Sequence, residues 1–261
     1  MRLTSIEPQP FHEQEYWSSG PRGVPRQLSL PFLRARVARG ALKGCGGLLI
    51  ISDTQGREHG PPEPGRLLGV AVAEELELMA ELGMIPALDQ LGVVLAGDLY
   101  DYPDLRKLGG SGEVGPVWDA FEQRCRWVVG VLGNHDLVEH ASAHQILDGD
   151  EVTRDGLTIG GVSGIVGRPD KPNRKTDADY MGLLKRVLRR SPELVVLHMG
   201  PDHPEKGFVG SESVRQTLAE ARRFEGLVAF GHCHWPEALL SDGHAQLLNV
   251  DGRVVLVTEE D

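Results

Sequence analysis

The 261-residue sequence lacks several features that mark special classes of protein. It has three cysteines, Cys45, Cys125 and Cys233, an odd number without paired spacing, which argues against a disulfide framework and predicts free thiols. No apolar run reaches the roughly 18 residues that a membrane span needs, and the start, MRLTSIEPQPFHEQ, has no apolar signal segment. A convincing Ser-His-Asp set and a Gly-rich phosphate loop are also missing. We therefore expect a cytoplasmic protein that does not contact the membrane.

Acidic residues are absent from one segment although the net charge is -11. Such a charge disfavours non-specific binding to nucleic acid. Between Tyr16 and Ser52 there is no acid, while five arginines and one lysine occur there. We expect residues 1–47 to form a basic extension punctuated by prolines, with a short helix near PFLRARVARGAL, ahead of a domain spanning 48–261. The alternative is that the extension docks an acidic protein partner.

Short apolar runs recur along the rest of the chain. The runs that predict buried strands are GLLIISD (47–53), GVVLAGD (92–98), RWVVGVLGN (126–134), ELVVLHM (193–199) and GLVAFGH (226–232). Helices are expected between them, near residues 66–82, 117–125 and 211–224, together with an amphipathic helix in DADYMGLLKRVLRRSP. This order predicts a layered α/β architecture with a mixed sheet or two facing sheets and helices outside.

Two Asp-Gly pairs predict tight hairpin turns. Asp155-Gly156 lies within VTRDGLTIGG and Asp251-Gly252 within LLNVDGRVVLV, so each pair is flanked by strand-like residues. Asp-Gly is a preferred dipeptide of two-residue hairpin turns. Both pairs are therefore expected to join neighbouring antiparallel strands.

Polar side chains follow each of the five predicted strands. The residues at these ends are Asp53, Gln55, Asp98, Asn134, His135, His198, His232 and His234. Open α/β sheets bind ligands at the carboxyl ends of their strands, and this mixture of carboxylate, amide and imidazole suits divalent metals. Any one of these residues alone has an ordinary explanation, such as a turn, a cap or a core histidine. Five strand ends with such donors predict a shared metal site.

The order D-x-Q, G-D, G-N-H-D, H and G-H-x-H resembles that of the calcineurin-like metallophosphoesterase superfamily over residues 48 to 258. The resemblance implies a four-layer α/β/β/α sandwich with mixed sheets flanked by helices and two adjacent divalent ions. It implies that Asp53, Gln55, Asp98 and His234 bind the first ion. The second ion would be bound by Asp98, Asn134, His198 and His232, so that Asp98 bridges.

Gln55 departs from the family pattern, which usually has histidine at this position. An amide oxygen is a harder and weaker donor than imidazole. We expect Gln55 to ligate and to favour Mn²⁺, with Fe, Zn or Mg as possible alternatives. The other interpretation is that Gln55 turns away and water takes its place. Asp101 stands where the purple acid phosphatases have tyrosine, which argues against an iron-tyrosinate centre.

The resemblance also implies a mechanism. Two metal ions would activate a water for in-line attack on a phosphodiester or phosphomonoester. His135 would contact the phosphate and act as general acid, and Asp136 would orient its imidazole. The loop 164–177 offers Arg168, Lys171, Arg174 and Lys175 for the substrate, or is simply a solvated basic loop.

Three functions remain open on the sequence alone. The first is a metallophosphoesterase acting on a small phosphorylated substrate, either as a phosphodiesterase or as a phosphatase. The second is a nuclease acting on DNA or RNA, which would use the acid-free segment and the 164–177 loop to bind the backbone. The third is a non-catalytic interaction module that contains metal, with its N-terminal extension as the interface.

Overall fold

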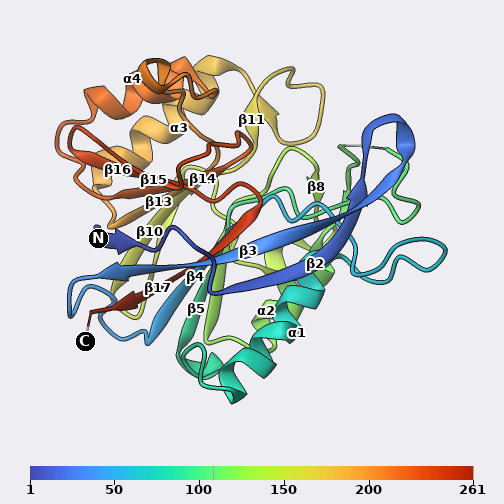
Figure 1. Ribbon diagram of the computed structural model, residues 1–261. Coiled ribbons are helices and arrows are strands. Elements are labelled where there is room, and N and C mark those ends of the chain that lie inside the picture. Colours follow the sequence, from blue (N-terminus) through green and yellow to red (C-terminus); the bar gives the residue numbers. More distant parts are fainter. Residues whose placement is uncertain (108, 261) are drawn as a thin grey trace.

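The structure is a computed structural model that describes residues 1–107 and 109–260. Its fold is mixed α/β, with two large mixed sheets and four α-helices among the described residues. Figure 1 shows α3 and α4 on one side of the sheets and α1 and α2 on the other. The layered α/β expectation is confirmed at this level.

The first large sheet has seven strands and contains both early and late parts of the chain. Its strands are β1 (Leu3–Ile6), β2 (His12–Ser19), β3 (Pro25–Val37), β4 (Gly47–Ser52), β5 (Leu91–Leu95), β7 (Trp127–Gly130) and β17 (Arg253–Glu259). The path runs β1-β3-β17-β4-β5-β7, and β2 pairs with β3. The neighbours β4, β5 and β7 are parallel, so their carboxyl ends meet at one edge.

The second large sheet has six strands. Its strands are β9 (Asp150–Arg154), β10 (Leu157–Val162), β13 (Leu194–Met199), β14 (Leu227–Gly231), β15 (Leu239–Asp242) and β16 (Ala245–Asn249). The strands β10, β13, β14 and β16 are parallel neighbours. Two small two-stranded sheets pair β6 (Gly112–Glu113) with β8 (Asp136–Leu137) and β11 (Ile165–Val166) with β12 (Arg174–Lys175).

Four α-helices lie where the sequence predicts them. They are α1 (Leu68–Glu81), α2 (Gly115–Glu122), α3 (Asp177–Arg190) and α4 (Glu212–Glu220). Thr176 caps α3, because its hydroxyl accepts a hydrogen bond from the backbone N–H of Asp179. Short 3₁₀ turns are η1 (Pro21–Gly23), η2 (Leu88–Gln90), η3 (Ala141–Ala143) and η4 (Pro204–Lys206). No helix among the described residues is long and apolar enough to cross a membrane.

Strand β4 shows why the sheets are buried on both faces. Leu48 and Ile50 belong to a buried cluster that also contains residues of the second sheet, such as Val196. Leu49 and Ile51 belong to another cluster, which α1 and α2 share. Because successive strand residues point to opposite faces, the continuous apolar run GLLIIS buries both. A third cluster packs α3 and α4 against the second sheet.

The three cysteines are buried and free, as predicted. The Asp155-Gly156 hairpin is also confirmed, since it joins the antiparallel strands β9 and β10. Both of its residues have positive φ, at 49° and 83°. This is the backbone of the tight turn that Asp-Gly favours.

Two expectations from the sequence need correction. The predicted helix near PFLRARVARGAL is absent. Residues 31–37 of this stretch belong to β3 instead, and β3 pairs with β17, so residues 25–37 are part of the first sheet. The second correction concerns Asp251-Gly252. This pair does not close a hairpin, because β16 belongs to the second sheet and β17 to the first. The turn instead carries the chain from one sheet to the other.

Candidate metal centre

The carboxyl ends of two groups of parallel strands supply the candidate site. Asp98 follows β5 of the first sheet, His198 lies in β13, and His232 follows β14 of the second sheet. One ligand atom from each of these three residues lies within 4.8 Å of the others. The structure thus brings three of the predicted metal ligands, Asp98, His198 and His232, together at the edge where the two sheets meet.

Asp98 and His198 are the most buried pair at this edge. Asp98 is 3% exposed and His198 is fully buried. The His198 Nε2 lies 3.4 Å from the Asp98 Oδ2. Burial alone would raise the pKa of Asp98, but the charge of His198 lowers it to about 2. In the same way burial would lower the pKa of His198, and Asp98 raises it to about 10.

The buried polar atoms that have no hydrogen-bond partner among the described residues include the Oδ1 of Asn134 and the Nε2 of His198. The other ring nitrogen of His198, Nδ1, lies 2.9 Å from the carbonyl oxygen of Ala96. Since a carbonyl oxygen only accepts, Nδ1 carries a proton, and Nε2, which faces the carboxylate of Asp98, is the nitrogen that can bind a metal when it loses its own proton. An unpaired buried atom is costly, so the Oδ1 of Asn134 calls for a ligand.

Three residues at this edge have an unusual backbone conformation. Asp53, Asp98 and His232 have left-handed φ values of 53°, 54° and 64°. Non-glycine residues seldom adopt this region, and when they do they cluster at functional sites. Each of the three directly follows the last residue of a strand or lies within three residues of it. The kink turns the side chain from the strand toward the shared edge.

Two glycines allow the loops to approach closely. A Cβ on Gly133 would lie 2.0 Å from the Oδ1 of Asp98. A Cβ on Gly97 would lie 2.3 Å from the backbone nitrogen of Gly133. The G-D and G-N-H-D segments therefore need glycine at these positions because any side chain would push Asp98 away from Asn134.

Asp53 lies against the loop that carries His232. Its Oδ2 accepts hydrogen bonds from the Ser52 hydroxyl at 2.6 Å and from the backbone N–H of His232 at 3.0 Å. Burial raises the pKa of Asp53 well above its usual range, and the neighbouring Asp251 raises it further. The accumulation of carboxylates makes this part of the edge attractive to a cation.

His232 is exposed on the outer side of the trio. Its ring centroid is 5.1 Å from that of His198. Burial lowers the pKa of His232 to about 4, and the charge of His198 contributes. A neutral imidazole at neutral pH is the form that binds metals.

Gln55 lies next to the same carboxylate. Its Nε2 donates a hydrogen bond of 3.3 Å to the Asp98 Oδ2. The amide nitrogen therefore faces Asp98. Ligation through Oε1 requires the amide to turn over, and it stays a prediction.

His234 lies apart from the trio. Its side chain is 65% exposed, and its Nδ1 lies 3.5 Å from the Oδ1 of Asp251. Asp251 is a residue that the sequence assigned only to a turn. Its proximity to Asp53 and His234 shows that the edge contains one more carboxylate than the motif order indicates.

Asp136 has a different set of contacts from the one expected. Its Oδ2 accepts hydrogen bonds from the backbone N–H groups of Asp98 and Gly133, and its Oδ1 accepts one from Leu99, each at 2.8 Å. Burial raises the pKa of Asp136 to about 6, and Asp98 adds to the effect. The carboxylate thus fastens the Asp98 loop to the Asn134 loop instead of contacting the imidazole of His135.

His135 is half-buried beside the trio. Its Nδ1 lies 3.2 Å from the hydroxyl of Ser111. Its backbone N–H donates to the Oδ1 of Asp98 at 3.0 Å. Burial lowers the pKa of His135, and Arg174 lowers it further. Among the described residues, Ser111 is the one whose side chain contacts the imidazole Nδ1 of His135.

The loop 164–177 is attached to the site by Asn173. Its Nδ2 donates to the carbonyl oxygens of Gly133 at 2.9 Å and Asp136 at 2.6 Å. This brings Arg174 within electrostatic range of His135 and His232, since its charge contributes to the lowered pKa of both, after burial.

The other basic residues of this loop are engaged elsewhere or exposed. Arg168 forms an exposed ion pair with Asp170 at 2.7 Å. Lys171 is also exposed. Lys175 lies 3.1 Å from Asp148 and donates to the carbonyl oxygen of Ser163. Of the predicted substrate-binding residues, Arg174 is therefore the one placed beside the histidines.

Three residues of this site were not found by sequence reasoning: Ser111, Asn173 and Asp251. Ser111 follows a glycine pair and carries no motif. Asn173 has a left-handed φ of 51°, which asparagine tolerates better than most residues, so its position in PDKPNRK gives a weak signal. Asp251 was missed because the Asp-Gly pair was interpreted as a hairpin turn.

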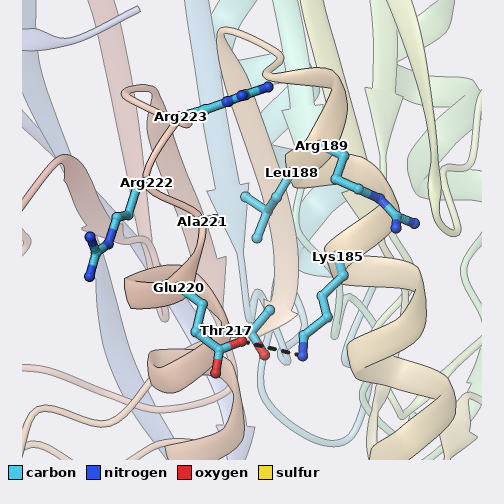
Figure 2. Close-up of a pocket in the computed structure, with 8 residues that line it drawn as sticks. All are labelled: Lys185, Leu188, Arg189, Thr217, Glu220, Ala221, Arg222 and Arg223. Carbon is cyan, nitrogen blue, oxygen red and sulfur yellow. Dashed lines mark ion pairs between the residues drawn. The ribbon is translucent and has the colours of Figure 1, made fainter.

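One pocket lies away from this edge. It measures about 460 Å³ and lies between the C-terminal parts of α3 and α4. Figure 2 shows Lys185 paired with Glu220, at 3.4 Å, while Arg189 and Arg222 point away from each other. These helices lead into the amino ends of β13 and β14, opposite to the edge with His198 and His232. The cavity therefore belongs to a different part of the molecule.

A second group of metal-binding residue types contains Asp119, Glu122 and His144. The His144 Nδ1 lies 3.1 Å from both carboxylate oxygens of Glu122. The ring also stacks on Trp118, with centroids 5.5 Å apart. The contacts of His144 with Glu122 and Trp118 account for this group.

Comparisons with known proteins give little further information. No family model matches the chain, and no curated protein matches it. A 5'-nucleotidase from Candida albicans SC5314 is 14% identical, with a TM-score of 0.44, over 78% of this chain and 44% of that enzyme. A protein of unknown function from Aquifex aeolicus is 12% identical, with a TM-score of 0.35, over 80% of this chain and 95% of that one. This chain spans less than half of the nucleotidase, and likenesses of this size carry no conclusion about its activity.

Proposed function

We propose that the protein is a metal-dependent phosphoesterase with two divalent ions, most readily Mn²⁺, at the shared edge of its sheets. The observation that carries this proposal is the meeting of Asp98, His198 and His232, whose ligand atoms lie within 4.8 Å of one another. The proposed architecture is the four-layer sandwich of the calcineurin-like metallophosphoesterases. It is supported by the buried cluster common to both sheets and by the helix pairs packed on their other faces.

The side chains fit the second ion best. Asp98 supplies a carboxylate, Asn134 an unpaired amide oxygen, and His198 and His232 imidazole nitrogens. This mixture of oxygen and nitrogen donors suits ions such as Mn²⁺. The first ion would be held by Asp53, Gln55, Asp98 and His234, of which Gln55 must turn its amide over.

Hydrogen bonds within the protein fix the positions of several proposed metal ligands. Asp136 holds the backbones of Asp98 and Gly133 together, and Ala96 fixes the tautomer of His198. Once bound, the ions would lower the pKa of a water molecule and neutralise charge that develops on the phosphoryl oxygens. Because Asp98 and His198 are held in this way, little reorganisation of these two donors accompanies the reaction.

His135 would donate the proton that the leaving group needs. Its pKa is lowered by burial and by Arg174. A bound phosphate is an anion and raises the pKa of a neighbouring histidine. The proton would therefore be held at His135 when substrate is present, with Ser111 at Nδ1 orienting the ring so that Nε2 faces the ester.

Arg174 is the proposed phosphate-binding residue of the rim. Its guanidinium can donate two parallel hydrogen bonds to a phosphate. Asn173 anchors the loop on Gly133 and Asp136, which keeps the guanidinium near the histidines. A single cationic side chain of this kind suits a small substrate with one phosphate.

Support for a nuclease is weaker. Two arginines of the acid-free segment are used inside the fold, where Arg34 donates to the carbonyl of Met84 and Arg36 to the carbonyl of Glu259. A backbone-binding surface needs such groups to be free for phosphates.

The direct test is turnover of bis-p-nitrophenyl phosphate and p-nitrophenyl phosphate with and without Mn²⁺. The proposal predicts metal-dependent release of nitrophenolate from at least one substrate by the wild type. It predicts loss of this activity in Asp98→Asn, with Asp119→Asn in the surface group as the matched control. Equal rates in wild type and Asp98→Asn would overturn it.

A further inference from the structure

The chain crosses between the two sheets beside the proposed metal centre. β16 ends at Asn249 in the second sheet and β17 begins at Arg253 in the first. The three residues between them include Asp251, which forms a bridge with Ser52 at the end of β4. Asp251 is thereby placed next to Asp53.

This crossing also holds the segment that carries His234. The Nδ2 of Asn249 donates to the carbonyl oxygen of Cys233 at 2.7 Å, and its Oδ1 accepts from the backbone N–H of Trp235 at 3.3 Å. Arg253 donates to the carbonyl oxygen of Trp235 at 2.8 Å. Both side chains are buried. The backbone on either side of His234 is therefore fixed by residues that flank Asp251.

Within this frame, Asp251 faces the imidazole of His234. Its Oδ1 lies 3.5 Å from the Nδ1 of His234, and its side chain is only 18% exposed. Among the residues described, no other side chain is recorded as a hydrogen-bond or ion-pair partner of its carboxylate. An aspartate in a simple turn would face solvent or its own backbone, so this orientation needs another reason.

The orientation matches that of outer-sphere carboxylates in metal sites. A ligating histidine commonly donates its second ring N–H to a carboxylate, which fixes the tautomer and makes the ring a better donor. With Nδ1 directed at Asp251, the Nε2 of His234 is left to face an ion. Such support matters most where another ligand is weak, and Gln55 is the weak donor of the same ion.

We propose that Asp251 is a positioning residue that holds His234 in its metal-ligating orientation and so supports the first metal ion at a site with glutamine in place of histidine. This inference rests on the proposed function. It concerns affinity for the ion and assigns Asp251 no contact with substrate.

The test compares Mn²⁺ binding to wild type and Asp251→Asn by isothermal titration and by electron paramagnetic resonance of free Mn²⁺. Wild type is expected to bind two ions. Asp251→Asn is expected to lose ~10–100-fold in affinity for one ion, the usual effect of removing such a partner, and to keep the other. Asp155→Asn is the matched control, because it alters the other Asp-Gly turn, and its two affinities are expected to match those of wild type.

The outcomes separate the inference from the function on which it rests. If wild type binds no Mn²⁺, the proposed function fails and the inference with it. If wild type binds two ions and folded Asp251→Asn binds both equally well, the inference alone is overturned.

A measurement on the wild type covers the case in which Asp251→Asn does not fold. Nitrogen-detected NMR of metal-free protein, at a pH where the imidazole is neutral, reports the tautomer of His234. A proton on Nδ1 is expected, since the carboxylate of Asp251 accepts it. A proton on Nε2 would overturn the inference.

Discussion

The Nε2 of His198, in β13 of the second sheet, lies 3.4 Å from the Oδ2 of Asp98, which follows β5 of the first sheet. This contact joins the two sheets at their shared edge. It is longer than an ordinary hydrogen bond, and Nε2 has no hydrogen-bond partner among the described residues. A proton on His198 supplies the positive charge beside Asp98, and in our account a metal ion would take its place.

The first prediction concerns Gln55. Imidazole is a stronger donor than an amide oxygen for transition ions. Gln55→His is expected to bind one of two Mn²⁺ ions about tenfold more tightly, and Zn²⁺ more tightly still, following the order of intrinsic affinities. Isothermal titration gives both constants. Gln216→His, an exposed change on α4, is the control, and equal affinities in all three proteins would contradict ligation by residue 55.

The second prediction concerns His135. General acids contribute roughly 10²–10⁴-fold to rate. His135→Ala is expected to lose this factor in kcat while it keeps both metal ions, because His135 is not among the proposed ligands. Steady-state kinetics and metal analysis of the same preparation test this. His140→Ala, an exposed histidine five residues later, is the control, and unchanged kcat in His135→Ala would exclude the role.

The third prediction separates the arginines of the 164–177 loop. Arg174 lies near the histidines, and Arg168 pairs with Asp170 in solvent. A charge-assisted hydrogen bond contributes about 1.5–3 kcal/mol, so Arg174→Ala is expected to lower kcat/KM about 10–100-fold. Arg168→Ala is expected to stay within about twofold of wild type, as exposed ion pairs contribute little. The reverse ranking would show that the loop presents Arg168 to the substrate.

The fourth prediction is a pH dependence of stability away from the site. Asp155 accepts hydrogen bonds from Arg126 at 2.8 Å and from the indole N–H of Trp127 at 2.7 Å. The hydrogen bond from Arg126 lowers the pKa of Asp155. A carboxylate with a lowered folded-state pKa stabilises above its unfolded value, near about 3.9, and loses that contribution as the pH falls through the folded value.

Asp155→Asn is therefore expected to reduce the free energy of unfolding by about 1–2 kcal/mol at pH 7. The difference from wild type is expected to shrink as the pH falls below about 4, where the unfolded carboxylate becomes protonated. Urea denaturation at both pH values measures it. A difference that stays constant with pH would show that the ion pair contributes nothing.

The sequence alone predicted the strands that build the site and the residues at their ends. This succeeded because a buried parallel strand needs a continuous apolar run, and the polar residue after it stands out. GLLIIS and LVVLHM are such runs. Asp98, His198 and His232 could thus be predicted, as each lies at or after the end of a run of this kind.

The first strands were harder to identify. In β3, Leu33, Ala35 and Val37 face the cluster between the sheets, with Arg34 and Arg36 between them. Residues four apart share a face in both a helix and a strand, so Leu33 and Val37 fitted either period. Pairing with β17, more than 200 residues later in the chain, decides for the strand, and no local signal reports that pairing.

Asp251 was missed for a related reason. Asp-Gly has the same local preference whether it closes a hairpin, as Asp155-Gly156 does, or crosses between sheets. Only the packing of β16 and β17 into different sheets directs its carboxylate at His234. Ser111 and Asn173 likewise acquire their roles from the neighbouring loops and not from their own sequence.

The most direct test of the central claim is anomalous diffraction from a crystal soaked in Mn²⁺. The account predicts two anomalous peaks about 3.5–4 Å apart with the carboxylate of Asp98 between them, one peak contacting the Nε2 of His198 and the other near Asp53. Absence of any peak within reach of Asp98 and His198, in a crystal that takes up Mn²⁺ elsewhere or not at all, would contradict it.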